Sequence, residues 1–352
     1  MSPRTKRWLT WTISLGLTAG LLYYFLRSID LHQVWAEIRV ASSNGTSARY
    51  LLLATLLEIL SIFLRAYRWR YMIRAVKSPI PFAPVLKATV VSFTLSRAAE
   101  VAKPFFLSRW QKLPFTPLLA SVVLERGMDL IALVFLWFGF ILFGTAGVAE
   151  DAQVHMDTLS KISYLILGAA IPLGLFLFWL VPRRRILDRI ARRSARLARY
   201  PLLVKAFRLL LKFAGGLGTF QRKRDILWVF LMSLVIWGLI AGSCWCILKA
   251  LVPGMPLGAS ILLLVCASAG AVLPTPGGVG SVHAGIQFAL VNFYDVAQNE
   301  AATVAILGHA IMFLPGILWG LLYLVFGRVR FTELKEAAGS KGEEGAAPGA
   351  GP

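Results

Sequence analysis

The chain has 352 residues, of which 57% are hydrophobic and only 15% are charged. A soluble domain needs more polar surface to cover its core, so this composition excludes an ordinary water-soluble enzyme and indicates a membrane protein. The formal charge of +20 would suit nucleic acid, but the basic residues concentrate between apolar runs, as in cytoplasmic loops, so no nucleic-acid partner is expected.

Long apolar runs, which are typical of membrane-spanning helices, recur along the chain. A hydrocarbon core of about 30 Å needs about 20 helical residues at 1.5 Å each. We therefore expect an all-α fold, a polytopic transmembrane helical bundle. The clearest runs are 8–26, 50–64, 130–143, 162–181, 226–248 and 301–326.

The N-terminal segment sets the predicted orientation. Basic residues precede the first run and no small-residue cleavage site follows it, so we expect an uncleaved anchor with a cytoplasmic N-terminus. The mixed-charge segment 27–47 then forms an external loop. The second run returns the chain and delivers a basic cluster to the cytoplasm, namely Arg65, Arg68, Arg70, Arg74 and Lys77.

The next apolar segment, 82–107, is interrupted by the polar stretch 96–100 and ends near Arg109 and Lys112. A single crossing would place these basic residues outside and the acidic loop at 150–157 inside, against the positive-inside rule. A re-entrant hairpin, which enters and leaves from the cytoplasm, corrects both signs. We therefore expect such a hairpin here.

A strongly basic segment follows the next two spans. The helix 117–143 runs outward, 162–181 returns, and 183–224 then contains fourteen Lys or Arg and a single acid, Asp188. Leu, Ile and Phe interleave with these bases at helical spacing, so we expect one or two amphipathic helices on the inner membrane surface. The charges either only fix the topology or also bind anionic lipid, and the sequence leaves both open.

The segment 257–293 consists of two apolar halves around Leu-Pro-Thr-Pro-Gly-Gly-Val-Gly at 273–280. Pro and Gly end helices, and broken backbone at membrane depth needs protein or a water-filled cavity to satisfy its polar groups. We expect a second re-entrant hairpin here, entering from the outer face. The run 301–326 then leads to a cytoplasmic C-terminus, where the polar residues 331–352 form a disordered tail.

These elements predict one transmembrane domain, 1–330, with about six full spans and two re-entrant hairpins. The order of elements in 6–143 recurs with reversed direction in 162–327, which makes an inverted repeat. Interrupted segments at corresponding positions of two halves indicate a binding site near the membrane midplane. Eight simple spans are the alternative.

Six ionisable residues around the first hairpin form the main candidate substrate-binding site. Those on the hairpin have the three-residue spacing of one helix face, and the two acids on the next helix lie one turn apart. Charged groups inside spans are costly and usually face a cavity or a partner. They indicate either a cavity for a zwitterionic or anionic headgroup, or ion pairs that tie the hairpin to its neighbour. The six are Arg97, Glu100, Lys103, Glu125, Arg126 and Asp129.

The C-terminal half supplies the remaining candidates. Gln287 and two histidines are polar islands, and a lone histidine in such surroundings is more often a packing residue than a ligand. The glycines do not form a nucleotide loop, because no Lys-Ser/Thr follows them. The chain also lacks the His and Cys spacings of metal sites, so we expect no metal, no cofactor and no catalytic residue. The candidates are Pro274, Pro276, Gly277, Gly278, Gly280, His283 and His309.

Three segments carry a family resemblance: SRAAEVAKPFFL at 96–107, LERGMDL at 124–130 and PTPGGVGSVHAGI at 274–286. Together they resemble the lysylphosphatidylglycerol synthase membrane-domain family, also called flippase-like proteins, over nearly the whole chain. The family usually has Glu near His283 and Arg near His309, so the resemblance implies that a histidine pair replaces a charged pair here. Matching positions are Glu100, Glu125, Arg126, Pro274, Pro276, Gly277, Gly278 and Gly280.

The resemblance implies a function in lipid handling. Members look like the membrane half of enzymes that aminoacylate phosphatidylglycerol, or like stand-alone proteins linked to lipid or polyprenyl-glycan handling. The chain ends soon after its last span, so we expect the soluble transferase domain to be absent and the protein not to be an enzyme. We expect a lipid-translocating or lipid-binding protein of the cell membrane, acting on a phospholipid or polyprenyl-glycolipid headgroup. The alternative is a membrane scaffold subunit for a lipid- or glycan-modifying enzyme.

Overall fold

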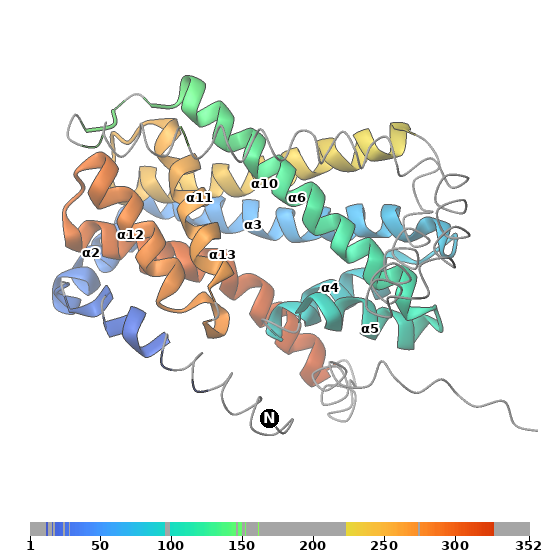
Figure 1. Cartoon of the computed structure of the whole chain (residues 1–352). Helices are drawn as coiled ribbons and strands as arrows, with labels where there is room; N and C mark the ends of the chain where they lie inside the picture. Colours follow the sequence, from blue (N-terminus) through green and yellow to red (C-terminus); the bar gives the residue numbers. More distant parts are fainter. Residues whose placement is uncertain are drawn as a thin grey trace, which may run out of the picture. The chain divides into compact units, whose positions relative to one another are not determined.

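The computed structural model describes residues 29–95, 99–145, 223–273 and 275–326, with pieces of 12–27 and isolated positions between 147 and 161. Every regular element in these residues is a helix, as the sequence predicts (Figure 1). The expected run at 8–26 is described only in part. The run at 162–181, the basic segment 183–224 and the tail 331–352 lie mostly or wholly outside the described residues, and so do Arg97 and Pro274.

Four helices are long and apolar enough to cross a membrane. Each has 28 or 29 residues, or about 42 Å at 1.5 Å per residue, which exceeds a hydrocarbon core of about 30 Å. The protein is therefore a multi-pass membrane protein, and four of the expected runs are confirmed as helices. They are α3 (Gly45–Met72), α6 (Phe115–Phe143), α10 (Lys223–Leu251) and α13 (Gln298–Phe326).

The segment 27–47 was expected to form a loop, which is wrong because most of it is helix α2 (Leu31–Ser43), while its external location stays a prediction. The carboxylate of Asp30 caps this helix by accepting hydrogen bonds from the backbone N–H groups of His32 and Gln33, at 2.8 and 3.4 Å. Mixed charge suggested a loop, but an Asp immediately before apolar residues at helical spacing is a helix-start signal. Asn44 ends α2, and α3 begins at the next residue.

The segment 82–107 does not form one straight helix. It is divided between α4 (Phe82–Thr94) and α5 (Ala99–Gln111), which pack against each other (Figure 1). Each has 13 residues, or about 20 Å, which is too short to cross a hydrocarbon core alone. The helical hairpin expected from the break at 96–100 is therefore present.

The second hairpin is also present, and glycine allows its two helices to touch. α11 (Leu257–Val272) and α12 (Ser281–Tyr294) pack side by side, joined through the short 3-10 turn η6 (Pro276–Gly278) (Figure 1). A Cβ atom on Gly285 would overlap the carbonyl oxygen of Cys266, and one on Gly270 would overlap that of Ser281. Small residues thus let the two backbones approach directly, as is common between membrane helices.

The chain divides into two compact units, each with its own apolar core. Each unit contains residues from both predicted halves, so the two units do not correspond to the two halves of the inverted repeat. The inverted repeat stays a prediction. The first unit takes its described residues from 1–65, 125–184 and 220–315, and the second takes its own from 66–124 and 316–352.

We expect Gly285→Ala to lower the thermal unfolding midpoint of the purified protein, because the new methyl group would push α11 and α12 apart. Overpacking of this kind typically costs about 1–3 kcal/mol. Gly238→Ala on α10 is the matched control, because a Cβ there meets no atom within 4 Å. Fluorescence-monitored melting in detergent would measure both, and a Gly285→Ala variant as stable as the control would contradict direct backbone packing.

Candidate functional site

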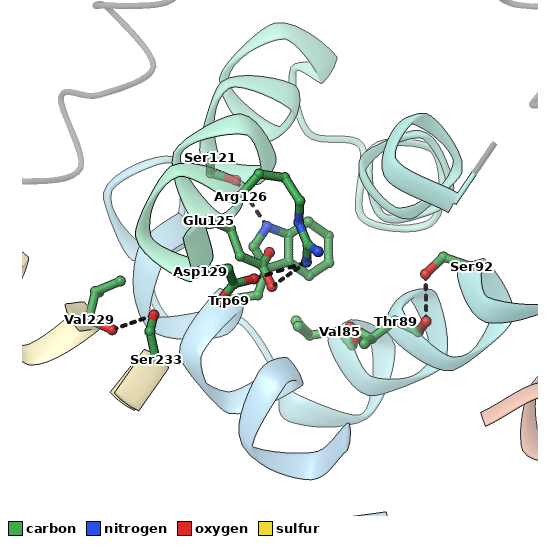
Figure 2. Close-up of polar contacts among 10 residues, drawn as sticks. All are labelled: Trp69, Val85, Thr89, Ser92, Ser121, Glu125, Arg126, Asp129, Val229 and Ser233. Carbon is green, nitrogen blue, oxygen red and sulfur yellow. Dashed lines mark hydrogen bonds and ion pairs between the residues drawn. The ribbon is translucent and has the colours of Figure 1, made fainter. Parts of the chain in front are cut away.

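Three of the predicted ionisable residues meet on α6, within the first unit (Figure 2). Nη2 of Arg126 lies 3.6 Å from Oε1 of Glu125 and 3.3 Å from Oδ2 of Asp129. The two acids are buried, whereas 41% of the arginine side chain is exposed. Because the acids are four residues apart on one helix face, a single guanidinium reaches both carboxylates.

In the second unit, the predicted Lys103 is buried against an aromatic ring. Its Nζ lies 4.4 Å from the centroid of the Trp69 ring, where the negative face of the indole attracts a cation. Trp69 is itself fixed, because its Nε1 donates a hydrogen bond of 2.9 Å to Ser121 (Figure 2). Glu100, in the first turn of α5, is exposed.

The tip of the second hairpin depends on glycine. Gly277, Gly278 and Gly280 have φ angles of 63°, 73° and 81°, a region that L side chains rarely adopt. Ser281 donates a hydrogen bond from Oγ to the carbonyl of Gly278 at 3.2 Å, and its Oγ lies 2.7 Å from Oγ1 of Thr275. Since serine has one hydroxyl proton, Thr275 is the donor in the second bond. These contacts pair polar groups that the break in the helix exposes.

The predicted histidine pair forms at this tip. The rings of His283 and His309 have centroids 4.5 Å apart, although the residues come from α12 and α13. Nε2 of His309 donates to the carbonyl of Gly277 at 2.9 Å, because a carbonyl oxygen only accepts. The backbone N–H of Gly280 donates to Nδ1 of His283 at 3.2 Å, so that nitrogen carries no proton. His283 is therefore a neutral imidazole protonated at Nε2.

Two phenylalanines extend this pair into a row of four rings. Phe25 lies 5.1 Å from His283, and Phe313 lies 4.5 Å from His309, measured between ring centroids. The row joins the N-terminal segment, α12 and α13. Its position identifies both histidines as residues that hold the hairpin tip in place.

The first unit contains a cleft of about 630 Å³ between the hairpin and the N-terminal segment, a volume within the range of ligand sites. Small residues of α11 and α12 form much of its wall, while Leu273 and Phe288 are exposed beside it. Its lining consists of Leu21, Arg27, Cys266, Ala269, Gly270, Leu273, Ser281, Ala284, Gly285, Gln287, Phe288, Val291, Asn292 and Gln298.

The cleft has an apolar end and a polar end. Leu21 lies close to Gly280 at the hairpin tip, because a Cβ atom added to Gly280 would be only 3.2 Å from the Cβ of Leu21. Further along the N-terminal segment, the backbone N–H of Asp30 donates to Oδ1 of Asn299, so this segment passes the start of α13. Arg27, next to that contact in sequence, therefore lies toward the polar end. The other polar lining residues there are Gln287, Asn292 and Gln298.

A hydrogen bond also orders the polar end, because Nε2 of Gln287 donates to Oε1 of Gln298 at 2.8 Å. The sequence pointed to Gln287 as a polar island but missed the cleft. Arg27 was missed because it was assigned to an external loop, and Gln298 was missed although it follows the hairpin by only a few residues. The signal that could have been used was the group of polar residues that follows the small residues of the hairpin helices.

A double-mutant cycle tests whether the α6 cluster is an ion-pair network. Arg126→Gln leaves the buried carboxylates of Glu125 and Asp129 without their shared cation, so it should lower the free energy of unfolding. Glu125→Gln added to it should restore part of the loss, with an interaction energy of about 0.5–3 kcal/mol. Equilibrium unfolding in mixed micelles would measure the cycle. Strictly additive single-variant effects would contradict the network, and a cycle of Glu125→Gln with Arg39→Gln on α2 should be additive.

Comparison with known proteins adds one finding. A family model described as "Lysylphosphatidylglycerol synthase TM region" matches residues 11–320, which includes every described helix except the end of α13. No curated protein and no solved structure matches the chain significantly.

Proposed function

Because the chain belongs to the lysylphosphatidylglycerol synthase TM region family, we propose that it binds a membrane lipid in the α11–α12 cleft and moves the headgroup across the bilayer. The cleft is the observation that carries this proposal. It combines one apolar end with one polar end, which is the amphipathic pattern of a lipid. The family membership indicates a lipid-related function.

The apolar end suits a hydrocarbon chain. Ala269, Gly270, Ala284 and Gly285 present small surfaces, so an unbranched chain can lie against the helices without displacing side chains. Phe288, 51% exposed, adds apolar area beside Gln287 and Asn292, where a bound lipid chain would approach the polar end. Within a bilayer such contact stabilises the bound chain through van der Waals packing and not through release of water.

The polar end suits an anionic headgroup. Arg27 offers a planar guanidinium, which binds phosphate through two parallel N–H groups. Gln287, Gln298 and Asn292 add amide donors and acceptors, which can take the hydroxyl or amine groups of a headgroup. The chain therefore acts on phospholipid or polyprenyl-glycolipid headgroups in this proposal, as a carrier and not as an enzyme.

The α6 cluster supports movement in addition to binding. Ionisable groups within spans usually line a polar path or pair with each other. In the proposal, Glu125, Arg126 and Asp129 provide a second polar station for the headgroup, and the partly exposed Arg126 is the group that meets it.

Reconstitution into lipid vesicles tests translocation directly. Vesicles would contain phosphatidylethanolamine with a fluorescent label on the headgroup, and dithionite, which does not cross the bilayer, would bleach the accessible label. We expect vesicles with the protein to lose label from both leaflets, whereas protein-free vesicles lose only the outer label. Equal protection of the inner leaflet in both would reject translocation and favour the scaffold alternative.

A filled cleft should abolish the activity. Ala269→Phe places a ring in the cleft from an exposed position on α11, so we expect the bleaching of inner-leaflet label to slow at least tenfold. Ala271→Phe is the matched control, because Ala271 is also exposed on α11 but does not line the cleft. Equal rates for the two variants would show that the lipid passes elsewhere. Melting curves of both would confirm that each remains folded.

A further inference from the structure

A second, smaller pocket lies in the second unit, where α3 ends and the chain turns toward α4. Its volume is about 170 Å³. Three of its eight lining residues are basic, and none is acidic. The lining is Tyr67, Arg70, Tyr71, Arg74, Lys77, Ser78, Pro79 and Ile80.

Helical spacing explains why the side chains converge. Tyr67, Arg70, Tyr71 and Arg74 follow one another at intervals of three, one and three residues, which puts them on one face of a helix. That face continues from α3 into the 3-10 turn η1 (Ile73–Ala75). The following turn then brings the ammonium group of Lys77 and the hydroxyl of Ser78 to the same pocket.

The pocket is held in shape by the core beneath it. Nε of Arg70 donates a hydrogen bond of 2.7 Å to the backbone carbonyl of Ile80, and the side chain of Ile80 is buried in the apolar core of the second unit. Ile73, on the helical side, is buried in the same core. The guanidinium carbon of Arg74 lies 3.8 Å from the centroid of the Tyr71 ring. These contacts fix both arginines before any ligand arrives, which lowers the entropy cost of binding.

Cations at the end of a span also fix membrane topology, and for that role they need only be solvated. Topology alone does not require Arg70 to be bonded to the carbonyl of the buried Ile80 or Arg74 to be stacked on a ring. The bond to Ile80 uses Nε, so the terminal nitrogens of Arg70 provide the remaining N–H groups. The arrangement therefore matches an anion site better than a set of solvated charges.

We propose that this basic pocket binds a phosphate monoester. A monoester carries up to two negative charges near neutral pH and three acceptor oxygens, which suits two guanidinium groups, one ammonium group and nearby hydroxyls. The volume lies below the roughly 300–1,000 Å³ of sites for drug-sized ligands, so the pocket takes a phosphate group and not a nucleotide. The monoester of a membrane lipid and free inorganic phosphate share this chemistry. The proposal is independent of the α11–α12 cleft.

Titration calorimetry of the full chain in detergent tests the site, with dioctanoyl phosphatidic acid as the probe. We expect Arg74→Gln/Lys77→Gln to weaken binding at least tenfold, while Arg39→Gln, which removes a cation of α2, leaves it within twofold. Dioctanoyl phosphatidylglycerol, a phosphodiester with one charge, should bind at least tenfold more weakly than phosphatidic acid. Unchanged affinity in the double variant, or equal affinity for the two lipids, would overturn the proposal.

Two further measurements complete the test. Lys77→Gln alone changes an exposed turn residue, so it reports on binding if the double variant fails to fold, and we expect at least threefold weaker binding. An affinity unchanged by that substitution would overturn the proposal. Competition with inorganic phosphate then identifies the source: equal affinities assign the site to free phosphate, and tenfold tighter binding of phosphatidic acid assigns it to a lipid headgroup.

Discussion

A broken helix in an apolar environment leaves backbone N–H and C=O groups that lipid cannot pair, and this constraint decides the arrangement around the second hairpin. Side chains replace the missing helical bonds: His309 donates to Gly277, Ser281 donates to Gly278, and His283 accepts from Gly280. Because His309 belongs to α13, its bond to the Gly277 carbonyl attaches the hairpin tip to the last long helix. A backbone requirement, and not apolar contact alone, therefore holds α12 beside α13 in the first unit.

The same hairpin links stability to the proposed binding site. Gly270 and Gly285 allow the backbones of α11 and α12 to touch, and both also line the cleft. A side chain at either position would push α11 and α12 apart, and it would also take up space in the cleft. Substitutions at these glycines therefore affect folding and binding together, whereas Ala269 lines the cleft without closing a helix contact and separates the two effects.

The sequence predicted the parts that depend on local pattern. Apolar length predicted four of the long helices, and the Pro-Gly stretch 273–280 predicted the second hairpin, because composition alone imposes these features. The one-turn spacing of Glu125 and Asp129 likewise predicted that they share one face of their helix, and the structure shows that Arg126 reaches both. The helix at 31–43 was missed because mixed charge outweighed the cap at Asp30. The cleft was also missed, since Arg27 and Gln298 meet one wall only after the chain has folded back, and no local pattern encodes that.

Direct contact between α11 and α12 also has a mechanical consequence. The carbonyl oxygens of Cys266 and Ser281 already occupy the space that Gly285 and Gly270 leave open. Sliding one helix along the other would drive these oxygens against neighbouring residues that carry a side chain, so the hairpin resists shear and moves as one lever. Its pivots are the two non-helical joints, at 252–256 and 295–297, where Gly254 and Asp295 have positive φ angles. A rotation at these joints would move the far end of the lever, which is the tip that carries Gly277 and His283, and would have to break the bond from His309 to Gly277.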